Sequence, residues 1–167
     1  MNKFRHGPMG SALYSECEKY RYMLNRTLTH AQSSTSSILF ILLNPSTATE
    51  EVNDPTITRC MGYARRWGYD HLVICNIFAL RSTDPRLLYS ANDPIGPFND
   101  RTILFEAQRA TRVICGWGTH GAYLHRGEVV LDFLKREKIE LFCLRKTQEG
   151  FPGHPLYLKS TLEPQAL

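Results

Sequence analysis

The run Ile38-Leu39-Phe40-Ile41-Leu42-Leu43 is followed at once by Asn44-Pro45-Ser46, and this junction of apolar and polar residues decides the predicted fold. Six consecutive apolar residues, with β-branched and aromatic members, are typical of a central strand buried on both faces of a parallel sheet. Such a strand delivers the next residues to the carboxyl edge of the sheet, where ligands bind in open α/β proteins. We therefore expect Asn44 at a binding site.

Further apolar runs and helical patterns alternate along the rest of the chain. The apolar runs lie at 72–80, 113–118 and 139–144. Helical patterns lie at about 55–67, in a short turn after Asp84-Pro85, and at about 100–110 and 127–137. This alternation predicts an α/β fold with right-handed crossovers, namely a three-layer α/β/α sandwich around a four-stranded mainly parallel sheet.

Length and composition indicate one globular domain, 1–167, with its core at 38–158 and residues 1–37 as an N-terminal extension. The polar stretch 32–37 at the end of this extension is interpreted as a loop. The chain is 43% hydrophobic and 22% charged, and no segment approaches the roughly 20 apolar residues that span a bilayer. Because the first residues lack the apolar core of a signal peptide, we expect a cytoplasmic protein.

Cysteine usage and net charge restrict the chemistry further. The five cysteines form no Cys-x-x-Cys pair, and most lie in apolar runs, so we expect reduced core thiols, no metal site and no cofactor. A net charge of +4 is compatible with a polyanionic partner but does not require one.

Several short motifs resemble those of a known family. They are LNPSTA (43–48), NDPT (53–56), GxARRWG (62–68), NxFALR (76–81), DPxGPxND (93–100), WGxHG (117–121) and HPLYL (154–158). In these motifs the chain is similar to a bacterial and phage domain family of unknown function. That resemblance covers most of residues 20–158 and implies no activity.

The order of these landmarks also resembles the uracil-DNA glycosylase superfamily. Its members carry a GQDPY or GINPG-like segment after the first strand, then an asparagine-bearing strand, a strand ending in WGxxA, and a final HPSP. The corresponding segments here are 43–46, the run around Asn76, 117–120 and 154–157. The resemblance implies a uracil-DNA-glycosylase-like architecture and a site that cleaves the N-glycosidic bond of uracil or a modified pyrimidine in DNA.

The resemblance implies a role for each matching residue. Cleavage of the glycosidic bond places negative charge on the leaving base, and His154 would donate a hydrogen bond to that base. Asn44 would hold the attacking water. Asn76 would recognise the Watson–Crick edge of an extruded base, because an amide offers both a donor and an acceptor. Ser46 replaces a tyrosine that excludes 5-methyl groups, so a bulkier base would fit.

The chain also departs from the superfamily. Leu156 stands where a serine grips the DNA backbone, although Leu156 or Tyr157 could insert between bases as an apolar wedge. No phenylalanine follows Asn44 to stack on the base, and Tyr63 or Trp67 would have to replace it. These departures leave open whether the substrate is single-stranded DNA, RNA or a free nucleotide.

Charged residues near the same edge have two interpretations each. Asp54 either caps the following helix or supplies the carboxylate that the motif lacks. Basic side chains form either a phosphate-binding rim or a solvated surface; the candidates for nucleic-acid contact are Arg59, Arg81 and Lys159. Asn44 with Ser46 can also be a simple strand-end turn, His154 a solvated loop residue, and His120 is a second candidate histidine.

Together these features predict a monofunctional, metal-independent DNA glycosylase that acts as a monomer on single- or double-stranded DNA. Two alternatives remain. One is a non-catalytic module that binds a base or nucleic acid in the same pocket, and the other is a hydrolase or transferase of free nucleotides.

Overall fold

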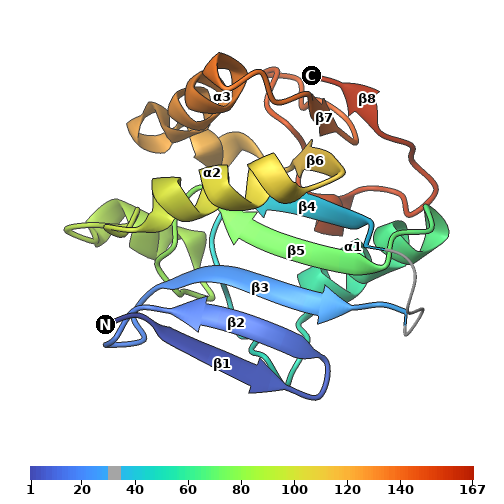
Figure 1. Cartoon of the computed structure of the whole chain (residues 1–167). Coiled ribbons are helices and arrows are strands. Elements are labelled where there is room, and N and C mark those ends of the chain that lie inside the picture. The colour runs from blue at the N-terminus through green and yellow to red at the C-terminus, as the bar shows by residue number, and fades with distance from the viewer. Residues whose placement is uncertain (30–34) are drawn as a thin grey trace.

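The computed structural model describes residues 1–29 and 35–167, and in that part of the chain it contains one mixed sheet of eight strands (Figure 1). The strand order is β1-β2-β3-β5-β4-β6-β7-β8. The strands are β1 (Lys3–Gly7), β2 (Gly10–Tyr14), β3 (Arg21–Thr27), β4 (Ser37–Leu42), β5 (His71–Asn76), β6 (Arg112–Cys115), β7 (Leu141–Cys143) and β8 (Gln165–Ala166). The helices are α1 (Pro55–Arg66), α2 (Asn99–Arg109) and α3 (Arg126–Arg136), with 3₁₀ segments η1 (Pro85–Ser90), η2 (Thr119–His125) and η3 (Pro155–Tyr157).

The prediction of a four-stranded mainly parallel sheet is wrong. The pairs β4–β5, β4–β6 and β6–β7 are parallel, whereas β1–β2, β2–β3, β3–β5 and β7–β8 are antiparallel. Residues 1–27, predicted to be an extension outside the core, contribute three of the strands, and the C-terminus contributes another. The uracil-DNA-glycosylase-like architecture was defined by the smaller sheet and is corrected with it. Of the predicted loop at 32–37, residues 32–34 lie outside the described residues.

Helices cover both faces of the central strands (Figure 1). Side chains alternate along a strand, so Leu39 and Ile41 of β4 face one side and Ile38 and Phe40 the other. The first pair packs with α2 and α3, and the second pair packs with α1. Burial on both faces explains why this strand has no polar residue between Ile38 and Leu43.

Local capping signals explain the start of α1 but not that of α2. The Asp54 Oδ1 accepts a hydrogen bond from the Ile57 N–H at 2.8 Å, and Pro55 occupies the first turn. The helix predicted at about 100–110 starts at Asn99, and no side chain caps it; Asp100, whose residue type is common at helix caps, does not act as one here. The carboxylate of Asp100 instead forms an ion pair with the buried Arg126.

Two buried arginines on β3 hold the long loop that follows β4. Arg21 is 2% exposed and donates to the Ala48 carbonyl. Arg26 is fully buried and donates to the Asn53 Oδ1 at 2.8 Å and to two backbone carbonyls of the same loop. Burial lowers the pKa of Arg21 to about 10, so its guanidinium remains charged at neutral pH. The N-terminal strands therefore fix the position of the loop at 44–54.

Two further facts concern the whole described chain. In residues 1–29 and 35–167, no helix is both long enough and apolar enough to cross a membrane. All five cysteines are free thiols, of which Cys17 is exposed and the other four are buried.

Candidate active site

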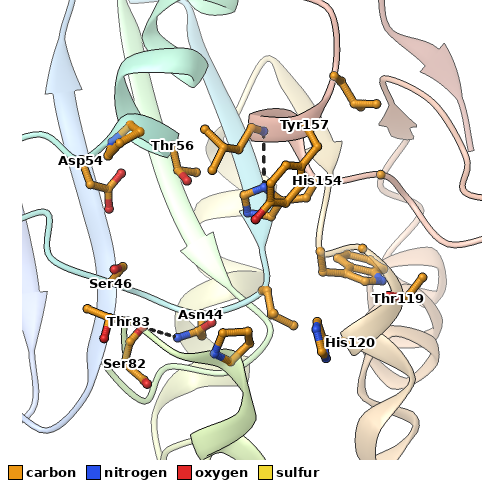
Figure 2. A pocket seen from close by; sticks show the side chains of 18 of the residues that line it. Asn44, Ser46, Asp54, Thr56, Ser82, Thr83, Thr119, His120, His154 and Tyr157 are labelled. Carbon is orange, nitrogen blue, oxygen red and sulfur yellow. Dashed lines mark hydrogen bonds between the residues drawn. The ribbon is translucent and has the colours of Figure 1, made fainter.

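A pocket of about 540 Å³ lies at the carboxyl edge of the parallel strands. Its lining comes from the segments after β4, β5, β6 and β7 (Figure 2). The helix after β4 packs on one face of the sheet and the helix after β6 on the other, so the gap between these neighbouring strands is a topological switch point. Open α/β sheets bind ligands at such points. The pocket thus lies at the position where the sheet topology predicts a ligand-binding site.

His154 is held as a neutral hydrogen-bond donor. Its Nδ1 accepts from the Leu156 N–H at 3.3 Å, which makes His154 the cap of η3. Burial lowers the pKa of His154 to about 4, against an opposing contribution from the Asp54 carboxylate. The ring is therefore neutral at pH 7, and because Nδ1 accepts, the proton resides on Nε2. The pocket thus contains an uncharged imidazole N–H donor.

Asn44 offers the pocket a hydrogen-bond acceptor, whereas His154 offers a donor. Its Nδ2 donates to the Ser82 carbonyl at 2.9 Å and to the Pro45 carbonyl at 3.1 Å. Because both acceptors are carbonyl oxygens, the amide nitrogen must point towards them, and the Oδ1 points away, as Figure 2 shows. Asn44 thus offers an acceptor that can bind a water or a ligand donor.

Asp54 supplies a carboxylate on a third side of the pocket (Figure 2). It is 8% exposed, and its Oδ1 is occupied by the helix cap. Its Oδ2 has no hydrogen-bond partner among the residues that the structure describes. Both interpretations of Asp54 are therefore compatible, since one oxygen caps α1 while the other remains available to a ligand.

A second histidine lines the same pocket. The Nδ1 of His120 lies 2.8 Å from the hydroxyl of Tyr89, which belongs to η1. His120 follows Gly118, whose φ of 71° lets the chain turn out of β6 into η2. Figure 2 shows His120 and His154 on different sides of the pocket.

The remaining lining mixes apolar side chains, such as Leu43 and Trp117, with short hydroxyl side chains and is almost uncharged. Its short hydroxyl side chains are Ser46, Thr47, Thr56, Ser82, Thr83, Thr119 and Thr147. No lysine or arginine lines the pocket within the described residues, so Asp54 is its one permanent charge. Nor do these residues include any group of three or more His, Cys, Asp or Glu side chains placed to hold a metal ion. The pocket is therefore suited to an uncharged ligand with several polar groups.

The structure brings six of the predicted site residues together in the lining of this pocket. Those that line the pocket are Asn44, Ser46, Asp54, His154, Leu156 and Tyr157. Asn76 is 2% exposed at the end of β5 and lies outside the lining. Tyr63 is 1% exposed, packs against Phe40 and Trp67, and donates to the Lys159 carbonyl at 2.5 Å. Tyr63 and Asn76 therefore do not border this pocket.

Of the three basic residues predicted to contact phosphates, two lie beside the pocket and one lies away from it. Arg59 and Lys159 border a shallow depression beside the pocket, and both neighbour Leu156 there. Neither of these two cations forms an ion pair within residues 1–29 and 35–167. Arg81 lies elsewhere, with its guanidinium over the Tyr14 ring at 5.2 Å and a hydrogen bond to the Glu18 carbonyl at 3.2 Å. Only Arg59 and Lys159 are positioned next to the pocket.

Sequence reasoning missed part of the site. Ser82 and Thr83 line the pocket after β5, and Thr56 and Thr119 line it from α1 and η2. Each of them follows a predicted strand or opens a predicted helix, which is a usable signal. Such residues are common in turns, so their position alone did not distinguish a ligand contact from a cap.

Comparison with known proteins identifies a family without an activity. The family described as "Protein of unknown function (DUF1643)" matches residues 21–156. Because this match covers most of the sequence, the chain belongs to the DUF1643 family. No curated protein and no solved structure matches the chain.

Proposed function

We propose that this protein hydrolyses the N-glycosidic bond of uracil or a modified pyrimidine in DNA. The observation that carries this proposal is the neutral imidazole of His154, which offers Nε2–H in a partly buried pocket. A leaving base gains negative charge, and a preorganised neutral donor stabilises that charge without the cost of burying a cation. The motif order that resembles the uracil-DNA glycosylase superfamily supports the same chemistry, although the architecture does not.

Two other groups in the pocket complement His154. The Asn44 Oδ1 is an acceptor that can hold the attacking water, and its amide nitrogen is already fixed by two carbonyls. The free Oδ2 of Asp54 can stabilise positive charge as it develops on the sugar. The bond breaks with its electron pair passing to the base nitrogen, while the water oxygen bonds to the anomeric carbon.

The charge distribution favours a nucleoside within a strand over a free nucleotide. A pocket of about 540 Å³ is within the usual range for small ligands, about 300–1,000 Å³. A free nucleotide would bring its phosphate charge to a pocket whose permanent charge is the Asp54 carboxylate. In a strand, the phosphates would instead lie outside the pocket, beside Arg59 and Lys159.

The test is incubation with labelled single- and double-stranded oligonucleotides that carry uracil, mismatched thymine or 5-substituted pyrimidines. Alkali followed by separation by length then reports any base that was removed. Free nucleosides and nucleotides are assayed in parallel by release of the base. We expect cleavage of one oligonucleotide class and none of the free nucleotides.

The matched variant is His154→Asn. An asparagine can still accept from the Leu156 N–H through its Oδ1 and cap η3, but its Nδ2–H lies nearer the backbone than the Nε2–H of the histidine and leaves that donor position empty. We expect base release to fall by at least about 100-fold, with an unchanged melting temperature. Equal activity in the variant would contradict the role of His154. Oligonucleotide binding with an intact glycosidic bond would identify a non-catalytic base-binding module.

A further inference from the structure

The two histidines of the pocket differ in which nitrogen can change its protonation. The Nδ1 of His154 accepts from a backbone N–H, which cannot reverse its direction, so its Nε2 must remain a donor. The Nδ1 of His120 faces the Tyr89 hydroxyl, which can donate or accept. His120 can therefore carry its proton on Nδ1 and present an unprotonated Nε2, which the environment of His154 does not allow.

A series of aromatic ring contacts positions this second histidine. The Tyr89 ring lies against the Tyr123 ring at 4.4 Å, and Tyr123 lies against Phe78 at 5.9 Å. Phe78 is fully buried in the sheet core. Tyr89 is itself 47% exposed, so this contact with Tyr123 is what connects it to the core. The hydroxyl that orients His120 is thereby attached to the rigid part of the fold.

Charged and ionisable groups near His120 come from η1 and from the pocket lining. Asp84, the cap of η1, is close enough that charge on His120 lowers the pKa of Asp84, after the larger effect of its hydrogen bonds with Arg86. The other ionisable side chains of the pocket are Asp54, His154 and Tyr157.

We propose that His120 is the proton acceptor for the attacking water, with the Tyr89 hydroxyl accepting the hydrogen bond from Nδ1–H. This role rests on the proposed glycosidic hydrolysis. As the water oxygen bonds to the anomeric carbon, one water proton passes to the Nε2 of His120. The bond between carbon and base breaks, and its electron pair passes to the base, whose charge the Nε2–H of His154 stabilises. His120 then returns the proton to the free base, so that no other reactant is needed.

The arrangement has the general form of an activated nucleophile, in which a base is oriented by a third group. Asp54 is the competing acceptor in the same pocket, but half of its carboxylate is committed to the cap of α1. The two histidines therefore have different predicted roles. His154 donates a hydrogen bond throughout the reaction, whereas His120 gains a proton and then loses it.

The test is the single-turnover rate of His120→Gln, from pH 4.5 to 9, on the oligonucleotide that the wild-type protein cleaves. We expect a loss of about 100-fold or more at neutral pH. The wild-type rate should fall on the acid side as His120 becomes protonated, and that fall should disappear in the variant. Binding of the same oligonucleotide with a 2′-fluorine on the target sugar, which slows bond cleavage, should not change.

Two further variants separate this role from a structural one. Tyr89→Phe keeps the ring contacts and removes the acceptor, so it should lower the rate by about 10-fold and shift the acid limb. His125→Gln is the matched control, since His125 lies in the same η2 segment with its side chain 82% exposed and outside the pocket.

The possible outcomes distinguish the proposed role of His120 from the proposed function of the protein. If the wild-type protein cleaves its substrate and His120→Gln stays within about threefold of it at every pH, the role of His120 is overturned while the proposed function stands. If His120→Gln loses activity together with binding of the fluorinated oligonucleotide, His120 is a binding residue and its role as proton acceptor is overturned. If the wild-type protein cleaves nothing, both proposals fail.

Discussion

Two walls of the same pocket are held in place by different means. The first, residues 44–56, is held by side chains, because Arg21 and Arg26 of β3 bind its carbonyls and Asp54 caps α1. The second, residues 116–120 together with 153–158, combines the side-chain contacts of His120 and His154 with backbone hydrogen bonds at its glycines. The first wall is therefore sensitive to loss of long polar side chains and the second to addition of even a methyl group.

Small residues make the second wall possible. The Gly118 N–H donates to the Pro152 carbonyl at 2.7 Å, and the Gly153 N–H donates to the Arg145 carbonyl at 2.7 Å. A Cβ on Gly116 would lie 3.0 Å from the Cδ of Pro155, the residue after His154. The position of His154 thus depends on close approach of two backbone segments.

The largest effect is expected at the first wall. Arg26→Met removes the donors to three acceptors of the loop at 49–53, so these partly buried oxygens lose a charged hydrogen-bond partner. We expect the free energy of unfolding, measured by urea denaturation, to fall by about 3 kcal/mol. Arg101→Met, at an exposed position of α2, should change it by less than about 0.5 kcal/mol. Equal effects of the two substitutions would contradict the role of Arg26 in holding this loop.

The next effect tests the second wall. Gly116→Ala forces Pro155 or its neighbours to move, and we expect about 2 kcal/mol of destabilisation together with loss of base release. The control is Gly62→Ala on the exposed side of α1, where an added Cβ meets nothing within 4 Å. That variant should be more stable by about 0.5–1 kcal/mol, since alanine favours a helix. A Gly116→Ala protein with wild-type stability would mean that the close approach is unimportant.

A smaller effect depends on pH. The folded-state pKa of His154 is about 4, below the roughly 6.5 of an unfolded histidine, so the unfolded chain binds more protons between these values. The contribution is fully present above about pH 6.5 and is lost as the pH falls towards about 4. We expect wild-type stability, relative to His154→Asn, to decline by about 1.5 kcal/mol over this range, a value reduced for partial solvent screening. A flat difference would contradict the neutral imidazole.

The smallest effect concerns the contact between α1 and Lys159, the residue that directly follows the second wall. Tyr63→Phe removes the hydrogen bond to the Lys159 carbonyl while preserving ring packing on Phe40. We expect a loss of about 1 kcal/mol in urea denaturation. Tyr157→Phe, at a side chain 83% exposed, is the control and should leave stability unchanged. A silent Tyr63→Phe would indicate that this hydrogen bond adds nothing to the stability of the wall.

The central strands were predictable because their apolar runs are continuous. Burial on both faces leaves a strong signal, as at residues 38–43, and the helix start at Asp54-Pro55 was equally clear. The pocket residues Asn44 and His154 were found because they come after predicted strands. Residues at the ends of parallel strands are thus accessible to sequence reasoning.

The N-terminal strands were not predictable, for a physical reason. Arg21 and Arg26 are buried, yet arginine in a sequence indicates an exposed position. Their partners, such as Ala48 and Asn53, lie 27 residues further on, and nothing local reveals the pairing. Strand β1 is almost wholly exposed, so it shows no apolar pattern either. A similar separation, 31 residues, hid the contact between His120 and Tyr89.

The position of β3 has a consequence for synthesis of the chain on the ribosome. Strand β3 pairs with β5, at residues 71–74, and not with β4, the next strand in the sequence. Residues 3–27 can form their own hairpins early, but their docking edge finds no partner until β5 has emerged. Strands β1–β3 therefore join the central sheet only after β4 and β5 have both been made, although β3 directly precedes β4 in the sequence.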